Sequence, residues 1–436
     1  MAQPQVKVGI MNEPTIEFVF HDEYFVDGVA VSGLQKATAV DGKVSWNGKI
    51  YDTIEFTPKD IEKEYFELIG VTIGVNFHWE RKENQAFRGA LRLIVEHGNL
   101  TAVNILPIEE YLLSVISSEM SATASLELLK AHAVISRSWL LAQIQKGQEL
   151  SANETPYSAC TQTEDELVRW YDREDHVNFD VCADDHCQRY QGITRESTQK
   201  VRDAIKATWG EILTYDGKLC DARFSKSCGG VFEEFENCWE PVHYNYLVAR
   251  SDSEHPTLFP DLTVEANAQK WILTAPESFC NTKDKSILSQ VLNSYDQETT
   301  DFYRWKVEYT QSELSELIRN RSGVDYGDII DLVPIARGTS GRLYRLKIVG
   351  TKKTQIIGKE LEIRRTLSPS HLYSSAFVVE KQGEGELPEK FILTGAGWGH
   401  GVGLCQIGAA VMGEKGYNYK EILLHYFIDA EIEKNY

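Results

Sequence analysis

Residues 108–144 carry two apolar stripes at helical spacing, and a glutamate lies in the short break between them. Pro107 suits the first position of a helix, where its missing N–H leaves nothing unpaired. The first stripe consists of Ile108, Leu112, Val115 and Ile116. Because these residues recur with helical periodicity, we expect a helix that ends near residues 117–119. Glu119 then stands at the end of this helix.

A second helix is expected to begin directly after this break. Ser125 is a good N-cap, and Glu127 is favourable in a first turn. The second stripe consists of Leu126, Leu129, Ala133, Leu140 and Ile144. Arg137 falls on this stripe, and a guanidinium is rarely buried without an anionic partner. We therefore expect Arg137 to reach an acidic group such as Glu109 or Glu110, or a ligand.

A cluster of cysteine and histidine follows in a polar, irregular region. The pattern is His176-(x)5-Cys182-(x)3-His186-Cys187. Two thiolates and two imidazoles form a complete tetrahedral donor set for zinc, although adjacent ligands require a tight turn. A saturated set leaves no open position for water, so the ion would be structural. The alternatives are a Cys182–Cys187 disulfide, or free thiols with two incidental histidines.

Glycine alternates with other residues from 395 to 403. An extended backbone there would have one bare face and one face with Trp398 and His400, and a bare face permits close approach of a sugar chain or of other backbone. Trp398 could stack on a pyranose, and His400 could hydrogen-bond a hydroxyl or help to transfer a proton. Tight packing of two backbones explains the glycines equally well.

Six cysteines lie outside the His176–Cys187 cluster and allow fifteen pairings, among which sequence cannot choose. Cys228 and Cys238 flank a short loop and are the most plausible disulfide in an exported protein. Cys405 has no adjacent histidine or acid, which favours a small buried hydrophobe over a nucleophile.

Composition excludes some classes of function. The chain has 436 residues and a formal charge of −20, which argues against nucleic-acid binding because that relies on clustered Lys and Arg. No apolar run approaches the length that spans a bilayer, and the N-terminus does not resemble a signal peptide. Tyr and Trp are numerous enough to line a glycan groove, but aromatic residues are more often core.

The expected fold class is α+β, a β-rich mixture with a central helix pair. Residues 1–105 read as a β-rich N-terminal region, with strands at 16–20, 29–31, 43–46, 54–56 and 91–95 broken by Gly, Asp and Asn. Residues 106–436 form the remainder, in which 260–320 look partly helical and 344–349 alternate as a strand. No strand–helix rhythm persists, so a doubly wound sheet is not expected.

Several segments resemble the SpoIID family (stage II sporulation protein D, also SpoIID/LytB), in the expected order. They run from about Val6 to the end of the chain: Phe87-Arg88-Gly89, Val103 to Leu112, Ser118-Glu119-Met120, Leu129 to Arg137, Ser227-Cys228-Gly229-Gly230, Ser340-Gly341-Arg342, Gly397 to Ala409, and Tyr419 to Tyr426. The Trp-Gly-His-Gly-Val-Gly run is the most specific of these motifs.

The resemblance implies a lytic transglycosylase that cleaves the bond between N-acetylmuramic acid and N-acetylglucosamine in peptidoglycan and leaves 1,6-anhydro ends. Glu119 would be the catalytic acid and then base, with its pKa raised by an apolar setting from Val115, Ile116 and Met120. Arg137, Trp398, His400 and Ser227 would contact substrate. A similar His/Cys cluster binds zinc in some family members, which supports His176, Cys182, His186 and Cys187 as ligands that pin a loop at about 170–190.

Family members act outside the cytoplasmic membrane, on glycan strands that are in some cases stripped of stem peptides, and some cooperate with a cell-wall amidase. The resemblance thus implies export, with a leader or anchor missing from this sequence. The main alternative is a noncatalytic glycan-binding enhancer of an amidase. A zinc hydrolase is disfavoured because no His-Glu-x-x-His pattern is present and the four-ligand set is closed.

Overall fold

The structure is a computed structural model that describes residues 3–74, 80–121, 123–152, 158–171, 176–184, 187–195, 198–255, 258–291 and 299–436. The chain divides into two compact units. Unit 1 comprises Met1–Ala152, Arg173–Leu213 and Ile432–Tyr436, and unit 2 comprises Asn153–Asp172 and Thr214–Glu431. The boundary expected near residue 105 falls within a strand of unit 1, and the division into 1–105 and 106–436 stays a prediction.

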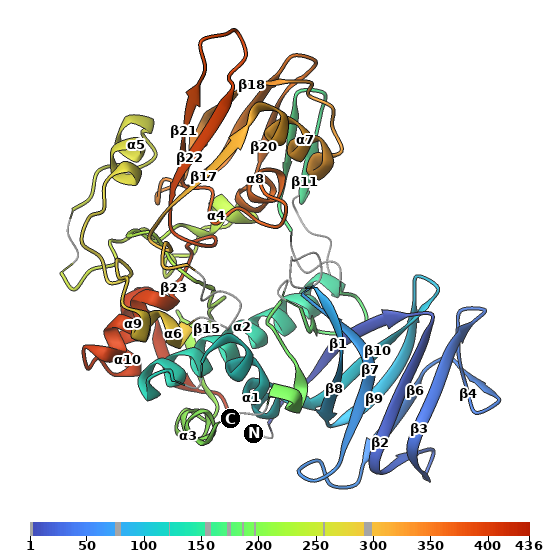
Figure 1. Ribbon diagram of the computed structural model, residues 1–436. Coiled ribbons are helices and arrows are strands. Elements are labelled where there is room, and N and C mark those ends of the chain that lie inside the picture. Colours follow the sequence, from blue (N-terminus) through green and yellow to red (C-terminus); the bar gives the residue numbers. More distant parts are fainter. Residues whose placement is uncertain are drawn as a thin grey trace. The chain divides into compact units, whose positions relative to one another are not determined.

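An 11-stranded sheet dominates unit 1, drawn mainly in blue in Figure 1. Its order is β13-β1-β10-β9-β6-β2-β3-β4-β5, and β7 branches from β2 to pair with β8. The strands are β1 (Gln5–Glu13), β2 (Thr15–Val26), β3 (Val29–Val40), β4 (Lys43–Trp46), β5 (Lys49–Tyr51), β6 (Ile54–Pro58), β7 (Tyr65–Ile73), β8 (Arg81–Arg88), β9 (Ala90–Glu96), β10 (Asn99–Pro107) and β13 (Val181–Cys182). All five strands expected in this region are confirmed.

Tight turns set the register of these hairpins. Asp27-Gly28, between β2 and β3, has φ of 50° and 76°, and Asn47-Gly48, between β4 and β5, has φ of 47° and 72°. Positive φ at both central residues is the turn geometry that matches the right-handed twist of the flanking strands. The Asp-Gly and Asn-Gly pairs of the sequence therefore end the strands where they occur.

Two helices follow the sheet and pack together, as the sequence predicts. Helix α1 (Ile108–Glu119) begins after Pro107 and ends at Glu119. Helix α2 (Leu126–Ala152) begins after Ser125, whose Oγ accepts a hydrogen bond from the Leu128 amide at 3.2 Å. A short 3-10 helix η2 (Gly192–Arg195) and α3 (Gln199–Ala207) complete the helical part of unit 1.

A buried ion pair joins α1 to α2. The Arg137 Nε and Nη2 atoms donate to the two carboxylate oxygens of Glu109 at 2.8 and 2.7 Å. The side chains of Arg137 and Glu109 are 0% and 3% exposed. Tyr436 Oη and the Gly210 amide also donate to Glu109, at 2.6 and 3.2 Å. The expected acidic partner of Arg137 is therefore Glu109.

Two larger sheets lie wholly within unit 2. One has the order β11-β12-β20-β19-β18 and the other β17-β22-β21. Their strands are β11 (Cys160–Gln162), β12 (Glu166–Arg169), β17 (Arg304–Thr310), β18 (Ile329–Arg337), β19 (Leu343–Gly350), β20 (Thr354–Gly358), β21 (Phe377–Gln382) and β22 (Lys390–Ala396). Both sheets share one apolar core with α7 (Gln311–Ser322) and α8 (Glu360–Thr366), centred on residues such as Trp305, Leu346 and Phe391.

Short elements make up the rest of unit 2. They are β16 (Phe224–Ser225), β23 (Leu404–Cys405), β15 (Lys218–Leu219), α4 (Phe235–Cys238), α5 (Glu265–Leu273), α6 (Lys285–Val291), α9 (Gln406–Glu414) and α10 (Tyr419–Tyr426). Strands β14 (Glu211–Tyr215) and β24 (Glu431–Lys434) cross the limits between the units. The expected mixed, β-rich architecture is confirmed.

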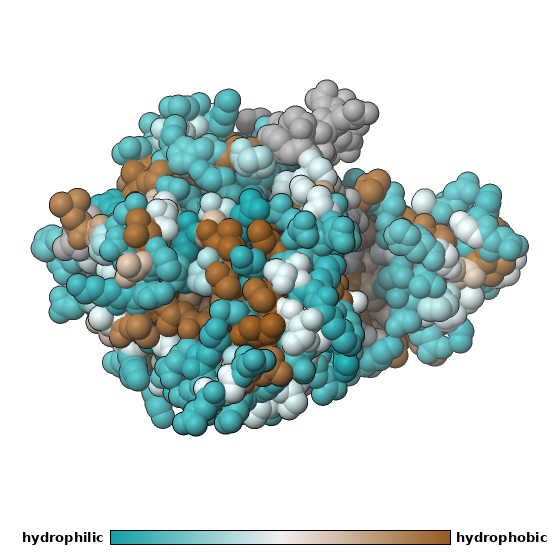
Figure 2. All heavy atoms as spheres, turned by 90° about the horizontal axis from the view of Figure 1, so that it is seen from above, coloured by the Kyte–Doolittle hydropathy of each residue, from teal (hydrophilic) through white to brown (hydrophobic). Residues whose placement is uncertain are grey.

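The face of the molecule in Figure 2 is mostly hydrophilic, with hydrophobic residues in smaller groups. This agrees with an excess of 65 acidic over 45 basic residues. Among the described residues, no helix combines the length and apolar character needed to cross a membrane.

The Arg137–Glu109 pair is expected to be a large contributor to the stability of unit 1. Removing one partner leaves the other charge buried and uncompensated, so Glu109→Gln should lower the free energy of unfolding by about 3–5 kcal/mol. The exposed pair between Lys36 and Glu17, at 3.0 Å, offers a matched control, and Glu17→Gln should change stability by less than about 1 kcal/mol. Denaturant unfolding followed by circular dichroism measures both. Equal, small effects would contradict this assignment.

Candidate functional site

Glu119 occupies the last position of α1 and is half-buried. One of its carboxylate oxygens accepts a hydrogen bond from the Arg189 backbone amide at 3.3 Å. The chain leaves the helix at Met120, whose amide still bonds to the Ile116 carbonyl at 2.9 Å. Both Ile116 and Met120 are buried. Glu119 is thus a partly solvated carboxyl group at the end of a buried helical turn.

The segment that supplies the Arg189 amide is fastened along α1. Tyr111 Oη donates to the side-chain oxygen of Gln188 at 3.3 Å, and the Gln191 amide donates to Ser114 Oγ at 3.0 Å. The rings of Tyr111 and Tyr190 stack with centroids 5.0 Å apart. Residues 188–191 are therefore fixed to the helix that positions Glu119. Arg189 is a residue near the predicted acid that sequence periodicity did not indicate.

Three of the four predicted metal ligands come together beside this segment. Ligand atoms of His176, Cys182 and Cys187 lie within 4.8 Å of one another, close enough to hold one ion. The fourth predicted ligand, His186, lies outside the described residues. The Cys182 amide approaches Cys187 Sγ at 3.4 Å, and the Cys187 amide donates to the Asp184 carbonyl at 3.0 Å. Both cysteines are free, so the Cys182–Cys187 disulfide alternative is wrong in this structure.

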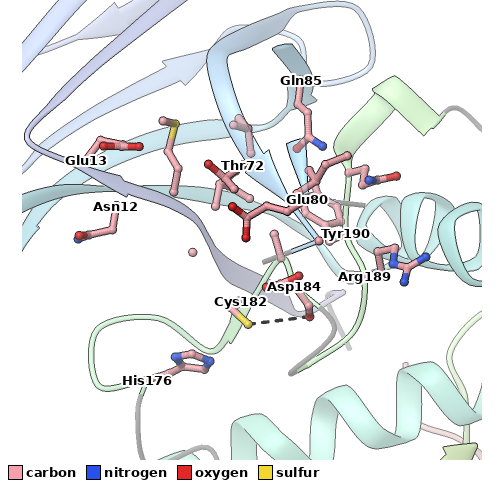
Figure 3. Close-up of a pocket in the computed structure, with 18 residues that line it drawn as sticks. Asn12, Glu13, Thr72, Glu80, Gln85, His176, Cys182, Asp184, Arg189 and Tyr190 are labelled. Atoms are coloured by element: carbon pink, nitrogen blue, oxygen red, sulfur yellow. Dashed lines mark hydrogen bonds between the residues drawn. The ribbon is translucent and has the colours of Figure 1, made fainter. Parts of the chain in front are cut away.

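A pocket of about 530 Å³ opens next to the metal-ligand group. Figure 3 shows His176 and Cys182 on one side of it, with the polar side chains of Asn12, Glu80 and Arg189 around it. Its size lies within the range of small-molecule sites. Arg189 links this pocket to Glu119, because it is one of the residues that line the pocket and its amide donates to the carboxylate.

The glycine-rich segment of unit 2 differs from the expected extended strand. Strand β22 ends at Ala396, and Gly397, Gly399, Gly401 and Gly403 have φ between 71° and 92°. These left-handed positions make the backbone wind rather than extend. A Cβ on Gly401 would lie 2.5 Å from the Arg342 guanidinium, and one on Gly403 would lie 2.1 Å from the Arg223 carbonyl oxygen. Close packing within the protein therefore accounts for these glycines.

Arg342 holds this segment from within. Its buried guanidinium donates to the carbonyls of Gly399, Cys228 and Ser227 at 3.0, 2.9 and 3.2 Å, and to Ser340 Oγ at 2.9 Å. Ser340 Oγ in turn donates to the fully buried carboxylate of Glu233 at 2.6 Å. The Ser340-Gly341-Arg342 motif of the sequence thus serves to fasten the glycine-rich segment to the turn at 227–228.

Trp398 and Ser227 meet through their backbones, with the Trp398 amide 2.8 Å from the Ser227 carbonyl. The Trp398 ring is half-buried between Tyr373 and Phe302, with centroid distances of 4.2 and 4.6 Å. Ser227 is fully buried. A substrate contact by Trp398 stays a prediction that its partial exposure permits, whereas Ser227 as placed here faces protein groups.

His400 is partly buried and contacts other protein groups. Its Nδ1 accepts a hydrogen bond from the Val402 amide at 3.0 Å, and its ring packs edge-on against Trp239 at 4.9 Å. Burial and the guanidinium groups of Arg223, Arg364 and Arg342 hold the pKa of His400 well below its ordinary value, so the imidazole is neutral. A neutral ring whose Nδ1 already accepts a hydrogen bond favours a structural role over proton transfer.

Four buried residues of unit 2 gather in a cluster that the sequence pattern did not reveal. They are Cys228, Asp252, Cys280 and Cys405, whose ligand atoms lie within 4.8 Å of one another. Cys228 Sγ lies 3.5 Å from Cys280 Sγ, and all eight cysteines are free, so the expected Cys228–Cys238 disulfide is wrong in this structure. No sequence signal could find this cluster, because its members are far apart along the chain.

Two family models match the chain. The model described as stage II sporulation protein (SpoIID) matches residues 96–215, which contain Glu119, Arg137 and the four predicted ligands of the loop. A domain of unknown function (DUF8618) matches residues 233–403, which contain Trp398 and His400.

Three curated relatives illustrate the similarity. An uncharacterized protein of Brachyspira hyodysenteriae is 26% identical over 346 residues, 79% of this chain and 72% of that protein. Stage II sporulation protein D of Bacillus subtilis is 23% identical over 335 residues, 76% of each chain. The amidase enhancer of Bacillus subtilis is 24% identical over 331 residues, 72% of this chain but 39% of the enhancer.

The resemblance indicated by the sequence motifs is therefore confirmed, because residues 96–215 match the model of the stage II sporulation protein (SpoIID) family and a stage II sporulation protein D is among the relatives.

Proposed function

We propose that the protein is a lytic transglycosylase that remodels peptidoglycan, with Glu119 as its catalytic residue. The observation that carries this proposal is the SpoIID match over residues 96–215, in which Glu119 ends α1 and accepts a hydrogen bond from the amide of Arg189, a residue that lines the pocket. The names of two relatives, a sporulation protein and an amidase enhancer, are consistent with work on the cell wall.

In the proposed reaction, protonated Glu119 gives its proton to the glycosidic oxygen between N-acetylmuramic acid and N-acetylglucosamine. The bond from this oxygen to C1 breaks, and the oxygen leaves as a hydroxyl. The C6 hydroxyl of the muramyl residue then attacks C1 and loses its proton to the Glu119 carboxylate. One group serves both proton transfers because the nucleophile belongs to the substrate. Two separate carboxylates, as in most glycosidases, are not required.

The surroundings of Glu119 suit both forms that this reaction needs. The C-terminal end of a helix carries partial negative charge, which favours the neutral carboxylic acid before the reaction. The Arg189 amide, at 3.3 Å, supplies one hydrogen bond to the carboxylate that forms after proton transfer. Partial exposure leaves the group within reach of a glycan.

The pocket of unit 1 is the proposed glycan subsite. Its lining includes carboxylate, amide and guanidinium side chains, such as Glu80, Asn12 and Arg189, which can hydrogen-bond sugar hydroxyls and acetamido groups. Among the residues proposed from sequence, Trp398 of unit 2 is partly exposed and remains a candidate for a separate contact with glycan. Arg137, Ser227 and His400 are engaged by protein groups and are more readily explained as positioning residues.

We further propose that His176, Cys182, His186 and Cys187 bind a structural zinc ion. The two sulfurs and the imidazole that the structure describes fit zinc chemistry. Cys187 precedes Gln188 and Arg189, which contact Tyr111 and Glu119. An ion at this site would fix the segment that orients the catalytic carboxylate.

The substrate is proposed to be glycan outside the cytoplasmic membrane, stripped of stem peptides, and the partner a cell-wall amidase. A noncatalytic role is the second candidate, because the amidase enhancer is among the relatives. In that role the pocket would bind glycan without cleaving it, and stimulation of an amidase would be the activity.

Product analysis tests the catalytic proposal. Purified glycan strands, with and without stem peptides, are incubated with the protein, and the products are identified by mass spectrometry. We expect anhydromuramyl ends, and Glu119→Gln should slow their appearance by about 10²–10⁴-fold because the general acid is lost.

Glu127→Gln is the matched control, since Glu127 lies in the first turn of α2 and pairs with Lys130 at 2.7 Å. It should cleave at the normal rate. Reducing ends instead of anhydro ends would show hydrolysis and a missed second carboxylate. Retained glycan binding without cleavage, together with stimulation of an amidase, would support the enhancer role.

Metal analysis tests the loop site. Cys187→Ser should lower the zinc content of the purified protein by about one ion per chain, because three ligands bind zinc far more weakly than four. Its thermal midpoint and its rate of glycan cleavage should fall together. Cys160→Ser removes an exposed cysteine outside both clusters and should change neither. Lost turnover with an unchanged midpoint would indicate a catalytic ion, and unchanged zinc content would contradict the site.

A further inference from the structure

The cluster of Cys228, Asp252, Cys280 and Cys405 brings together four separate segments of unit 2. Cys228 follows β16, Asp252 lies in the loop after residue 250, Cys280 precedes α6, and Cys405 ends β23 directly before α9. In Figure 1, α6, α9 and α10 gather around β23 in the lower part of unit 2. All four cluster residues are buried.

The spacing of the ligand atoms fits a single tetrahedral ion. Cys228 Sγ lies 3.5 Å from both Cys280 Sγ and Asp252 Oδ2, and all four ligand atoms lie within 4.8 Å of one another. Zinc bonds of about 2.3 Å to sulfur and 2.0 Å to oxygen place tetrahedral neighbours about 3.5–3.8 Å apart. A disulfide requires sulfurs about 2.05 Å apart. The cluster therefore has the dimensions of a metal site rather than of a disulfide.

The two carboxylate oxygens of Asp252 make different contacts. Oδ1 is held by Tyr426 Oη at 3.1 Å and by His425 Nε2 at 3.2 Å. Oδ2 faces the sulfurs and accepts from the Cys280 amide at 3.2 Å. A ligating carboxylate whose second oxygen is fixed by outer hydrogen bonds is the usual arrangement around a protein-bound metal.

Backbone amides also point at the sulfurs. The Gly230 amide lies 3.4 Å from Cys228 Sγ, and the Cys228 amide lies 3.3 Å from Cys405 Sγ. Such donors stabilise thiolates, the form in which cysteine binds metal. Three thiolates and a carboxylate would carry four negative charges, and a divalent cation bound among them would offset part of this charge.

We propose that Cys228, Asp252, Cys280 and Cys405 bind a second zinc ion in unit 2. Soft sulfur ligands select zinc over magnesium or calcium, which prefer oxygen alone. The four ligands fill the tetrahedral shell, and the site is closed to solvent, so the ion is structural. This inference does not depend on the proposed transglycosylase activity.

The ion would hold the base of the glycine-rich segment. Cys228 directly follows Ser227, whose carbonyl accepts from the Trp398 amide, and the Cys228 carbonyl accepts from Arg342. Cys405 lies two residues beyond Gly403, the last of the left-handed glycines. Zinc binding would therefore tie both flanks of the glycine-rich segment to the helices α6 and α9. The two-residue strands β16 and β23 alone would hold these flanks weakly.

The test measures zinc in purified full-length chains by mass spectrometry of the metals. The starting variant is Cys182→Ser/Cys187→Ser, which removes the loop site. We expect it to retain about one zinc ion per chain. Adding Cys280→Ser should abolish this zinc, whereas adding Cys220→Ser should not, because Cys220 is equally buried but lies outside the cluster.

If the variant with Cys280→Ser fails to fold, cobalt substitution of the starting variant tests the proposed metal site of unit 2 instead. Intense visible bands of tetrahedral cobalt with sulfur-to-cobalt charge transfer would support the site, and adding Asp252→Asn should alter them. Absence of these bands would overturn the proposal. A chain free of zinc, or one whose mass and alkylation reveal a Cys228–Cys280 disulfide, would overturn it as well.

Discussion

A guanidinium group cannot lose its proton in a protein, so each buried arginine must be surrounded by acceptors, and those acceptors fix the chain around it. Arg137 imposes this constraint in unit 1, where Glu109 binds it through both oxygens and joins α1 to α2. Arg342 imposes it in unit 2, where three carbonyl groups from distant parts of the chain and the nearby Ser340 hydroxyl accept its hydrogen bonds. In each unit the arginine supports the segments that contain proposed functional residues. It is not itself placed to touch substrate. A buried guanidinium group can fix the conformation of the chain around it, because leaving the charge unpaired costs several kcal/mol.

The two sulfur clusters occur where regular secondary structure is sparse. In the described parts of the unit 1 loop, 176–184 and 187–191, the one regular element is the two-residue strand β13, and the turn after β16 is equally irregular. Such segments bury little apolar surface of their own, so a few directional bonds must hold them. In unit 1 the contacts of Tyr111 and Glu119 with residues 188 and 189 supply part of this restraint. A metal ion at either cluster would supply further restraint. In unit 1 it would support the segment that contacts Glu119, and in unit 2 the segment that contains Trp398.

Local signals in the sequence predict the local structure of this chain well. Helical periodicity and the Ser125 cap predict the limits of α1 and the beginning of α2, and the Asp-Gly and Asn-Gly pairs mark the hairpin turns of the large sheet. Strand β1 escapes a local interpretation because its pairing partners, β10 and β13, lie far away in sequence. For the same reason sequence does not bring Cys228 to Cys280 or Arg189 to Glu119. The glycine-rich segment is misjudged for a different reason: alternation implies an extended strand, but glycine permits left-handed positions that alternate just as regularly.

The geometry around Glu119 also explains how a single carboxylate could suffice for the proposed chemistry. A hydrolase must hold a water molecule opposite the leaving group, which requires a second base at a defined separation. A transglycosylase needs only to keep the muramyl C6 hydroxyl near C1, and the shape of a rigid groove can do that. The segment that contacts Glu119 is fixed to α1 by hydrogen bonds and ring stacking from Gln188, Tyr190 and Gln191. A rigid site in unit 1 would therefore make a second catalytic group unnecessary. Loosening the 188–191 segment would slow the reaction by disturbing the orientation of the Glu119 carboxyl group.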